Sequence, residues 1–333
     1  MKISVIITAF NRKEYITEAI NSVTNQSLET SKYEIIVISN FEVILSNINP
    51  DVEIKCIIMN GTVGEFLYKG FKMAKNDIIA FLDDDDVWGR ERLKKILRTF
   101  SLYPNLVYYH NSTWFMDSLG KPIELLFRNP ARVRKGNYFG KPINYKEISR
   151  LISVAAGFNL SSIAISKSAF VSSLETLRLI TANTDGFFFW VSLINRAEVY
   201  IDKRELTGYR IHDQNGSIAK NQLENGEEFL RQMGTYNLLL GFAMESFKDK
   251  LQMMFTQYIN LKLMELKAQF IMTSGKDRTE LISCAKEMLI FMRIPMDFST
   301  FRILLYTLSY MVSPKLYSLV IRKVSYSGFN RGV

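Results

Sequence analysis

The sequence has few of the residues that most often bind transition metals or form disulfides. Its 333 residues include two cysteines and two histidines. Cys56 and Cys284 stand far apart in the sequence and belong to no metal-binding or redox motif, so a reducing compartment is the simpler interpretation. No pair of cysteines or histidines has the spacing of a zinc site, which excludes the common zinc-dependent classes of protein.

Long hydrophobic runs are missing as well. No window holds the ~18 uninterrupted apolar residues that a membrane span requires. The opening residues 1–7 are too short for a signal peptide and lack a small-residue cleavage site. We therefore expect a soluble protein of the cytoplasm.

Glycine-rich phosphate-binding fingerprints are absent where they would be expected. The first predicted strand is followed by Thr8-Ala9-Phe10-Asn11-Arg12, which has neither the glycines of a dinucleotide-binding turn nor the lysine of a Walker motif. The sequence also has no Gly-x-Ser-x-Gly elbow, so it does not predict a serine hydrolase of that type.

The composition is that of a folded, enzyme-sized protein. Hydrophobic residues make up 47% and aromatic residues 13% of the chain, which is enough for a large core. The net charge of +9 is a modest excess that favours an anionic partner. We expect no nucleic-acid partner.

The first 110 residues alternate short β-rich runs with helical periods. Buried strands are predicted at residues 2–8, 33–39, 53–59, 77–82 and 106–109, and helices at 16–23, 64–75 and 90–103. Asn11 and Glu14 resemble a capping box before the first helix. Such alternation is typical of an α/β doubly wound, mostly parallel sheet with helices on both faces, and its ligands bind beyond the carboxyl ends of the strands.

The pattern changes twice further along the chain. Residues 111–218 form an α+β region, with a basic loop at 128–136, a strand at 159–166, an aromatic-rich helix at 184–196 and strands at 199–201 and 206–211. After Ser217 the pattern is helical, with apolar residues at three- and four-residue spacing, as in Tyr258, Leu261 and Met264. We predict an α/β domain at 1–218, with halves at 1–110 and 111–218, and an all-helical C-terminal region at 219–333.

The last part of the chain is basic and amphipathic. From Phe298 onward there are five basic residues and no acidic one, interleaved with aromatic and aliphatic residues. Pro314 divides this tail into two predicted helices. The pattern favours an element that lies on an anionic membrane surface, at the inner face of the cell membrane. The alternative is a helical pair that packs on the protein's own core or on a second subunit of a homo-oligomer.

Four consecutive aspartates follow the apolar run at residues 78–82: Asp83, Asp84, Asp85 and Asp86, here called the aspartate tetrad. Like charges this close repel one another, and burial adds to the cost unless a cation lies among them. A cluster rich in oxygen and poor in histidine suits Mg²⁺ or Mn²⁺. The period of a strand places Asp83 and Asp85 on one side, and we expect Asp86 to cap the following helix. The alternative is a run that only solvates a strand end.

Five segments together resemble the family 2 glycosyltransferases of the GT-A fold. They are residues 4–12, 34–38, 74–88, 183–190 and 209–217, and the third, which is very close to the family's DxD segment, is the most specific. The resemblance covers roughly residues 1–218. It implies a GT-A domain with a nucleotide-sugar-binding half and an acceptor half. It also implies inverting transfer of a sugar from a nucleotide-diphosphate donor to a hydroxyl group.

The resemblance assigns roles to individual residues. Asp85 is expected to bind Mn²⁺ or Mg²⁺ directly, with Asp83 on the metal or the ribose and His212 on the metal or the diphosphate. Asp185 matches the catalytic base, and its place at a helix N-terminus would keep it ionised; the alternative is a simple N-cap. The other residues expected to bind the donor are Thr8, Ala9, Phe10, Asn11, Arg12, Ser39, Asn40 and Asp84.

The sequence departs from the family in two places. Ser39 and Asn40 stand where many members have two aspartates, one of them on the nucleobase, so a preference for uridine is not implied. Leu67 and Tyr68 lie near the place of a common Arg-Asn pair. The processive-synthase motif is absent, which favours the transfer of one sugar at a time.

His110 is expected to be structural, and residues 157–159 are either an acceptor loop or a turn.

Two other functions stay open. A nucleotidyltransferase also places acidic metal ligands on a doubly wound sheet, but residues 8–12 lack the glycine- and lysine-rich loop that it needs. A degenerate transferase that only binds partners is the other, although every chemical group is retained. The basic loop and tail fit a lipid-linked glycan, a glycolipid or a surface polysaccharide as the acceptor.

Overall fold

The computed structural model describes residues 1–45, 51–123, 137–139, 145–153, 155–212, 222–246, 250–274, 278–290 and 298–313. The chain forms two compact units. One comprises Met1–Glu124 and Asn129–His212, and the other comprises Leu125–Arg128 and Asp213–Val333. The predicted basic loop at 128–136 and the tail after Pro314 lie outside the described residues.

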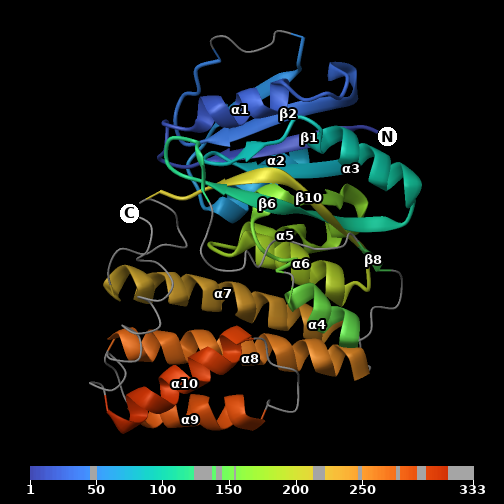
Figure 1. The fold of residues 1–333 in the computed structure, drawn as a ribbon. Coiled ribbons are helices and arrows are strands. Elements are labelled where there is room, and N and C mark those ends of the chain that lie inside the picture. Colours follow the sequence, from blue (N-terminus) through green and yellow to red (C-terminus); the bar gives the residue numbers. More distant parts are fainter. Residues whose placement is uncertain are drawn as a thin grey trace. The chain divides into compact units, whose positions relative to one another are not determined.

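The first unit is built on a mixed, mostly parallel sheet (Figure 1). Strands β3 (Ile54–Ile58), β2 (Tyr33–Ser39), β1 (Ile3–Ala9) and β4 (Ile78–Asp83) lie side by side in this order and are parallel. Next come β9 (Ile163–Ser166), β6 (Leu106–Met116), β10 (Glu198–Arg210) and the short β5 (Val87–Trp88). Strand β9 is antiparallel to both of its neighbours. The predicted α/β sheet is therefore confirmed.

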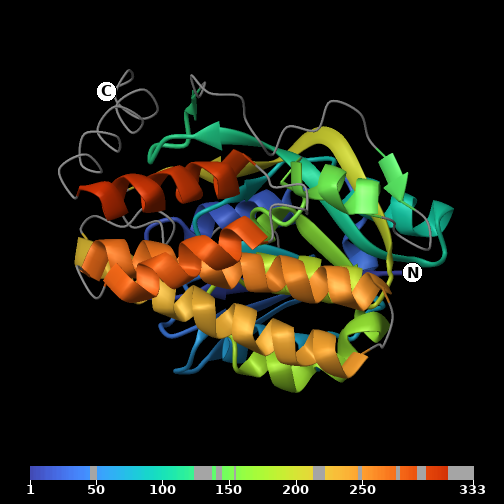
Figure 2. The ribbon, with the colours of Figure 1, turned by 90° about the horizontal axis from the view of Figure 1, so that it is seen from below.

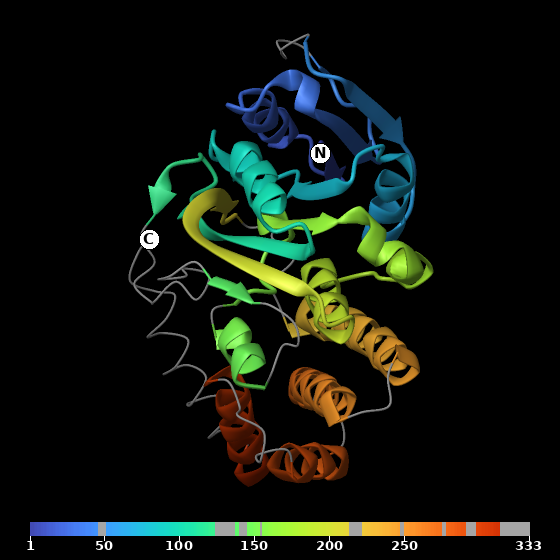
Figure 3. The ribbon, with the colours of Figure 1, turned by 90° about the vertical axis from the view of Figure 1, so that its right-hand side faces the viewer.

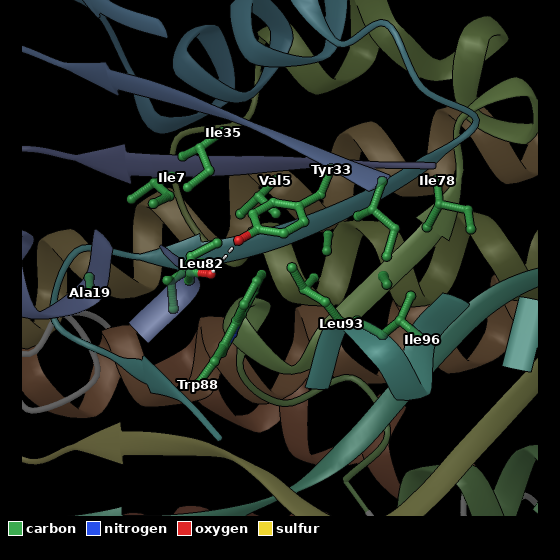
Figure 4. Close-up of a cluster of buried hydrophobic side chains, with 14 of the residues drawn as sticks. Val5, Ile7, Ala19, Tyr33, Ile35, Ile78, Leu82, Trp88, Leu93 and Ile96 are labelled. Carbon is green, nitrogen blue, oxygen red and sulfur yellow. Dashed lines mark hydrogen bonds between the residues drawn. The ribbon is translucent and has the colours of Figure 1, made fainter. Parts of the chain in front are cut away.

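Alternate residues of the central strands face different helices. Val5 and Ile7 lie in a core with α1 (Ile16–Thr24) and α3 (Arg92–Leu102), which Figure 4 shows around Trp88. Ile6 points the other way, toward α2 (Val63–Met73), where a Cβ at Gly70 would lie 2.6 Å from its Cγ2. Helices therefore cover both faces, as the alternating pattern predicts.

The paired strands β6 and β10 are each longer than the strands that the sequence predicts. Their pairing shifts register twice between Asp202 and Thr207, and Figure 3 shows β10 as a strongly curved ribbon. Such irregularities bend a strand without ending it. The strands predicted at 199–201 and 206–211 are thus one strand. The strand predicted at 106–109 runs on to Met116 because its polar residues are buried in hydrogen bonds, such as that from Asn111 Nδ2 to Thr207 Oγ1 at 2.9 Å.

The predicted capping box at Asn11 and Glu14 is wrong. Helix α1 begins at Ile16 without a side-chain cap. Asn11 adopts a left-handed backbone conformation, with φ of 59°, and its side chain pairs with Asn40 instead. A capping box does occur in α2, between Thr62 and Glu65.

The remaining elements of the first unit are short. They are β7 (Pro122–Ile123), β8 (Asn137–Phe139), α4 (Tyr145–Ser153), α5 (Leu174–Arg178) and α6 (Thr184–Ile194), with the 3-10 turns η1 (Thr30–Lys32), η2 (Leu160–Ser162) and η3 (Lys167–Ser173). Helix α6 is buried almost all round, and its Phe188 stacks on Phe81 of β4 at 4.5 Å between ring centroids. This contact fixes the start of α6 close to the sheet.

The described part of the second unit is helical. Figures 1 and 2 show α7 (Gln222–Ser246) beside α8 (Lys250–Ser274), with α9 (Arg278–Ile290) and α10 (Phe298–Val312) against α8. The predicted helical face is confirmed, since Tyr258 and Leu261 are buried. None of the described helices combines the length and the apolar character needed to cross a membrane.

Candidate active site

The predicted donor-binding residues gather at one edge of the sheet. Parallel strands end at the same edge, and here Thr8 of β1 is in register with Asp83, the last residue of β4. The Thr8 hydroxyl donates to Asp83 Oδ1 at 3.4 Å. Ser39 ends β2 beside them, in register with Ala9. The fold thus brings three separate predicted segments together.

The aspartate tetrad is a turn and not the continuation of a strand. Strand β4 ends at Asp83, and the Asp86 amide donates back to the Asp83 carbonyl at 3.3 Å. The predicted alternation of sides therefore does not apply beyond Asp83. The prediction that Asp86 caps the next helix is also wrong. Asp86 is buried, its Oδ1 accepts the Arg210 amide at 3.0 Å, and α3 begins only at Arg92.

Arg12 is the cation nearest to the tetrad among the described ion pairs. Its guanidinium pairs with Asp84, and its Nη1 lies 2.8 Å from Asp85 Oδ2. Burial opposes the positive charge, but Asp85 and Asp84 outweigh it and raise the pKa of Arg12. The loop after β1 therefore brings a fixed positive charge to the site.

One arginine does not neutralise four carboxylates. Burial, followed by the charges of Asp85 and Asp84, raises the pKa of Asp83 to about 8. Burial and Asp85 raise the pKa of Asp84 to about 6, against the effect of Arg12. Burial and its acidic neighbours also hold the pKa of Asp86 well above its ordinary value. The site has an excess of negative charge that favours a further cation.

The end of β10 supports the tetrad from the other side. Arg210 is buried, and its Nε donates to the Asp85 carbonyl at 2.8 Å while its Nη2 lies 2.5 Å from Glu18 Oε2. Its guanidinium lies over the Tyr15 ring. The His212 ring also packs against Tyr15, at 5.1 Å between ring centroids. His212 Nε2 is 3.1 Å from Asp85 Oδ2. His212, predicted as a metal ligand, therefore lies beside Asp85.

Asp185 lies in the first turn of α6, as predicted. Its Oδ2 accepts the Asn159 amide and its Oδ1 accepts the Gly186 amide, both at 2.8 Å. These two donors lower its pKa, but burial outweighs them and raises it. The net direction is opposite to the expectation that the helix N-terminus keeps this carboxylate ionised, because the charged form is poorly solvated.

Residues 159–161 join Asp185 to the tetrad. Asn159 donates its amide to Asp185, and the Asp83 amide donates to Ser161 Oγ at 3.0 Å. The charge of Asp185 also contributes to the raised pKa of Asp83. The strand predicted at 159–166 is thus only half correct. Its first half is the turn η2, which begins where Asn159 has φ of 67°, and β9 starts at Ile163.

The residues expected at the nucleobase lie on the neighbouring loop. Asn40 Oδ1 accepts the Asn11 amide at 2.9 Å, and Asn40 Nδ2 donates to Asn11 Oδ1 at 2.6 Å. Phe10 is 54% exposed. The Ser39 hydroxyl is buried and donates to the Phe41 carbonyl at 2.6 Å. Asn40 and Phe10 are therefore more accessible to a ligand than Ser39.

Two residues outside this set are structural. His110 is fully buried, its Nε2 is 2.7 Å from the Phe158 carbonyl, and burial lowers its pKa to about 4. It stays neutral and supports the loop at 157–159. A Cβ at Gly157 would lie 2.9 Å from the Phe189 ring, so this glycine allows the loop to pack on α6.

The site fits a divalent metal ion that binds together with a diphosphate. The described residues hold no group of three or more His, Cys, Asp or Glu side chains that forms a metal site by itself. Mg²⁺ usually takes only one or two protein carboxylates when substrate phosphates supply further oxygens. Asp83 and Asp85 are such carboxylates, and the uncompensated negative charge favours a cation. Metal binding stays a prediction.

Residues 4–164 match the family described as glycosyl transferase family 2. This segment, a little under half of the chain, is therefore similar to the family 2 glycosyltransferases. An uncharacterised glycosyltransferase of Nostoc sp. (strain PCC 7120) is 37% identical over 109 residues, which are 30% of this chain and 33% of that relative's length.

Solved structures show the fold of this chain. The structure of TarS 1–349 from S. aureus in complex with UDP-GlcNAc has a TM-score of 0.61 at 13% identity, over 99% of this chain and 93% of that one. The mannosyltransferase PcManGT from Pyrobaculum calidifontis, in complex with GDP-Man and Mn²⁺, has a TM-score of 0.50 at 11% identity, over 99% and 88% of the two chains. The likeness to TarS shows a GT-A fold.

Sequence reasoning missed part of what holds the candidate site together. Ser161, Asn159 and Tyr15 contact the predicted residues directly but carry no motif of their own. Arg210 lies inside the segment that led to His212, but β10 also carries Lys203 and Arg204, so no local signal singles Arg210 out.

Proposed function

We propose that this domain is a metal-dependent, inverting glycosyltransferase that moves one sugar from a nucleotide-diphosphate sugar to a hydroxyl group of an acceptor. The observation that carries the proposal is the connection through residues 159–161. Hydrogen bonds through these residues join Asp185, which fits a general base, to the acidic tetrad, which fits a metal-bound diphosphate. Each half of the reaction thus has residues that suit it.

The donor half consists of the loops after β1 and β2 and the tetrad. Asn40 and Phe10 are available to the nucleobase, and Arg12 brings a positive charge toward the phosphates. Mn²⁺ or Mg²⁺ held by Asp83, Asp85 and His212 would offset the negative charge that the departing diphosphate gains. The solved complexes of TarS with UDP-GlcNAc and of PcManGT with GDP-Man and Mn²⁺ support a donor of this class.

The acceptor half depends on Asp185. The acceptor oxygen forms a bond to the anomeric carbon while the bond from that carbon to the phosphate oxygen breaks. Attack from the face opposite the leaving group inverts the configuration, and Asp185 accepts the proton of the attacking hydroxyl. A raised pKa suits this role, because a carboxylate with an ordinary pKa is a weak base near neutral pH. A lipid-linked glycan, a glycolipid or a surface polysaccharide is the proposed acceptor.

A panel of nucleotide sugars with Mn²⁺ tests the donor class. We expect one nucleoside-diphosphate sugar, at about 100 times its Kd, to stabilise the folded protein by about 2.7 kcal/mol. For a domain of this size that shift corresponds to a Tm higher by roughly 5–10 °C in a thermal-shift measurement. The same donor should release its nucleoside diphosphate on turnover, and the shift should be lost in EDTA.

The other outcomes of this panel separate the competing functions. If no donor shifts the Tm with Mn²⁺, the proposed function is wrong. Pyrophosphate release from a nucleoside triphosphate and a sugar phosphate would identify a nucleotidyltransferase. Tight donor binding without turnover, with every candidate acceptor present, would favour a binding protein.

We also propose that the C-terminal helices hold the enzyme peripherally on the inner face of the cell membrane. Leu305, Leu308 and Val312 are exposed on α10 at spacings of three and four residues, so they share one face of that helix. Helix α10 contains no acidic residue, and the sequence after it adds four basic residues and no acidic one. An apolar face in a basic surrounding favours anionic lipid.

Sedimentation with vesicles of phosphatidylcholine and phosphatidylserine tests this placement. We expect the full chain to sediment with them. Leu305→Glu with Leu308→Glu should reduce binding by about tenfold or more, because each lost leucine contact with lipid is worth about 1.5–3 kcal/mol. Leu102→Glu with Leu119→Glu is the matched control, since both leucines are exposed in the first unit. If the wild-type protein does not sediment with the vesicles, the membrane proposal is wrong. Dimerisation of the wild-type protein through α10 would also contradict it.

A further inference from the structure

Asn159 has an unfavourable backbone conformation. Its φ of 67° and ψ of 107° lie outside the regions that residues other than glycine usually occupy, and the residue is only 4% exposed. A strained backbone of this kind persists only where the surroundings hold it, and it is most common at functional sites. The contacts of Asn159 therefore indicate what the strain serves.

The backbone amide and the side-chain oxygen of Asn159 contact different parts of the site. Its backbone amide donates to Asp185 Oδ2 at 2.8 Å, and its side-chain Oδ1 accepts the Ser161 amide at 2.9 Å. The side-chain Nδ2 is buried and has no hydrogen-bond partner among the described residues. The side chain is thus held by its oxygen, through the bond to Ser161.

Ser161 continues this connection to the donor half. Its Oγ accepts the Asp83 amide at 3.0 Å, and its carbonyl accepts Trp88 Nε1 at 2.9 Å. The side chain of Ser161 is fully buried. A continuous series of hydrogen bonds therefore runs from Asp185 through Asn159 and Ser161 to the backbone of Asp83, and the indole of Trp88 anchors it.

We propose that Asn159 and Ser161 are positioning residues that set the distance and orientation of Asp185 relative to Asp83. The inference rests on the proposed function, in which Asp185 accepts the acceptor proton while Asp83 serves the donor. These two events occur on opposite faces of the same sugar carbon, so the separation of the two carboxylates has to match the substrate. A misplacement of about 1 Å at such a site can lower the rate about 100-fold.

The substitution Asn159→Gly separates positioning from simple structural support. Glycine adopts a positive φ without strain, and this gain offsets the cost of about 1–3 kcal/mol of leaving the Ser161 amide without its acceptor. A merely structural view therefore predicts a variant about as stable and as active as wild type. The variant keeps the backbone amide that contacts Asp185 but loses the oxygen that holds Ser161. Positioning predicts that kcat for sugar transfer falls about 10- to 100-fold, that KM for the donor stays within about twofold, and that Tm does not fall.

Asn183→Gly is the matched control. Asn183 also has a left-handed backbone, with φ of 57°, and it precedes α6 without a side-chain capping bond. The chemical change is the same and φ is positive at both residues, although ψ is 45° at Asn183 and 107° at Asn159. The Asn183 segment also lies next to Asp185. We expect kcat of Asn183→Gly to stay within about threefold of wild type.

Ser161→Ala tests the donor end of the same connection. It leaves the Asp83 amide without its acceptor, so we expect the Mn²⁺ concentration for half-maximal rate to rise about tenfold. Asn159→Gly and Ser161→Ala interrupt the same series of hydrogen bonds. The kcat of the double variant should therefore be only slightly lower than that of the less active single variant. If Ser161→Ala does not fold, the comparison of Asn159→Gly with Asn183→Gly still decides.

The outcomes distinguish this inference from the proposed function. If wild type turns over no nucleotide sugar, the proposed function has failed. If wild type is active and Asn159→Gly keeps kcat within threefold, or if Asn183→Gly loses as much as Asn159→Gly, the positioning role is overturned.

Discussion

Asp85→Asn is expected to lower Mn²⁺-dependent turnover of the nucleotide sugar by on the order of 1,000-fold. Asparagine keeps the shape of the side chain but removes the charge that would bind the metal ion. A metal ion on the leaving diphosphate is worth several kcal/mol in the transition state, and about 4 kcal/mol corresponds to 1,000-fold in rate. Raising the Mn²⁺ concentration should recover only part of this loss.

The same change is expected to leave the fold intact. Asp85 is one of the charges that raise the pKa of Asp83 to about 8 and of Asp84 to about 6. Removing its charge relieves repulsion in the tetrad, while Arg12 keeps its partner Asp84. We therefore expect the Tm without metal to stay at or above that of wild type, so the activity loss does not come from unfolding.

Glu53→Gln is the matched control for Asp85→Asn. It also removes one carboxylate charge, but Glu53 is exposed and precedes β3, at the end of the strand away from the tetrad. Its activity should stay within about twofold of wild type. Turnover by Asp85→Asn at the wild-type rate in EDTA-treated, Mn²⁺-supplemented buffer would contradict metal binding at this carboxylate.

Patterns that depend on local periodicity were predicted well from the sequence. Helices α1 and α2 connect β1 to β2 and β3 to β4, and the parallel strands end at one edge. The strand ends at Thr8, Ser39 and Asp83 follow from this pattern, whereas the roles of these residues at a donor site were implied by the resemblance. Asp185 could also be placed, because an aspartate before an aromatic-rich helical run sits in that helix's first turn.

What the sequence could not predict depends on single residues in unusual backbone conformations and on buried polar contacts. The tetrad turns back at Asp86, because Arg210, 124 residues further along the chain, supplies the amide that Asp86 accepts. Asn11 caps no helix, and its side chain forms a hydrogen bond with Asn40 instead. The predicted strand at 159–166 is interrupted because Asn159 has a positive φ, and in this conformation its amide donates to Asp185. Each outcome depends on a partner distant in sequence, which no local pattern contains.

Asp185→Asn is expected to lower kcat for sugar transfer by about 100- to 10,000-fold, the usual contribution of a general base. Donor binding, measured by calorimetry with Mn²⁺, should be unchanged because the proposed role of Asp185 is on the acceptor side. Asparagine can accept only one of the two amides that Asp185 accepts, and one unsatisfied buried donor costs about 1–3 kcal/mol of stability. A folded variant with normal donor affinity and little transfer would therefore identify the proton acceptor.

The pH dependence of the wild-type enzyme gives an independent measure of the same residue. As the proposed base, Asp185 would act only when ionised, and burial raises its pKa above the ordinary aspartate value of about 3.9. As pH falls, kcat/KM should therefore begin to decline above the range in which an exposed aspartate titrates, and it should drop about tenfold for each further pH unit.

Two other titratable groups act near Asp185, and both can be separated from it. Tyr108 donates to the Ala156 carbonyl and its pKa is raised well above the usual value by burial, so it stays neutral. Asp83 has a raised pKa of its own, as do Asp84 and Asp86 in the same tetrad, but saturating Mn²⁺ would favour the charged forms of all three. At saturating Mn²⁺ the acidic limb should thus belong to Asp185, and it should be missing from the residual activity of Asp185→Asn. An acidic limb that persists in that variant would assign the base to another residue.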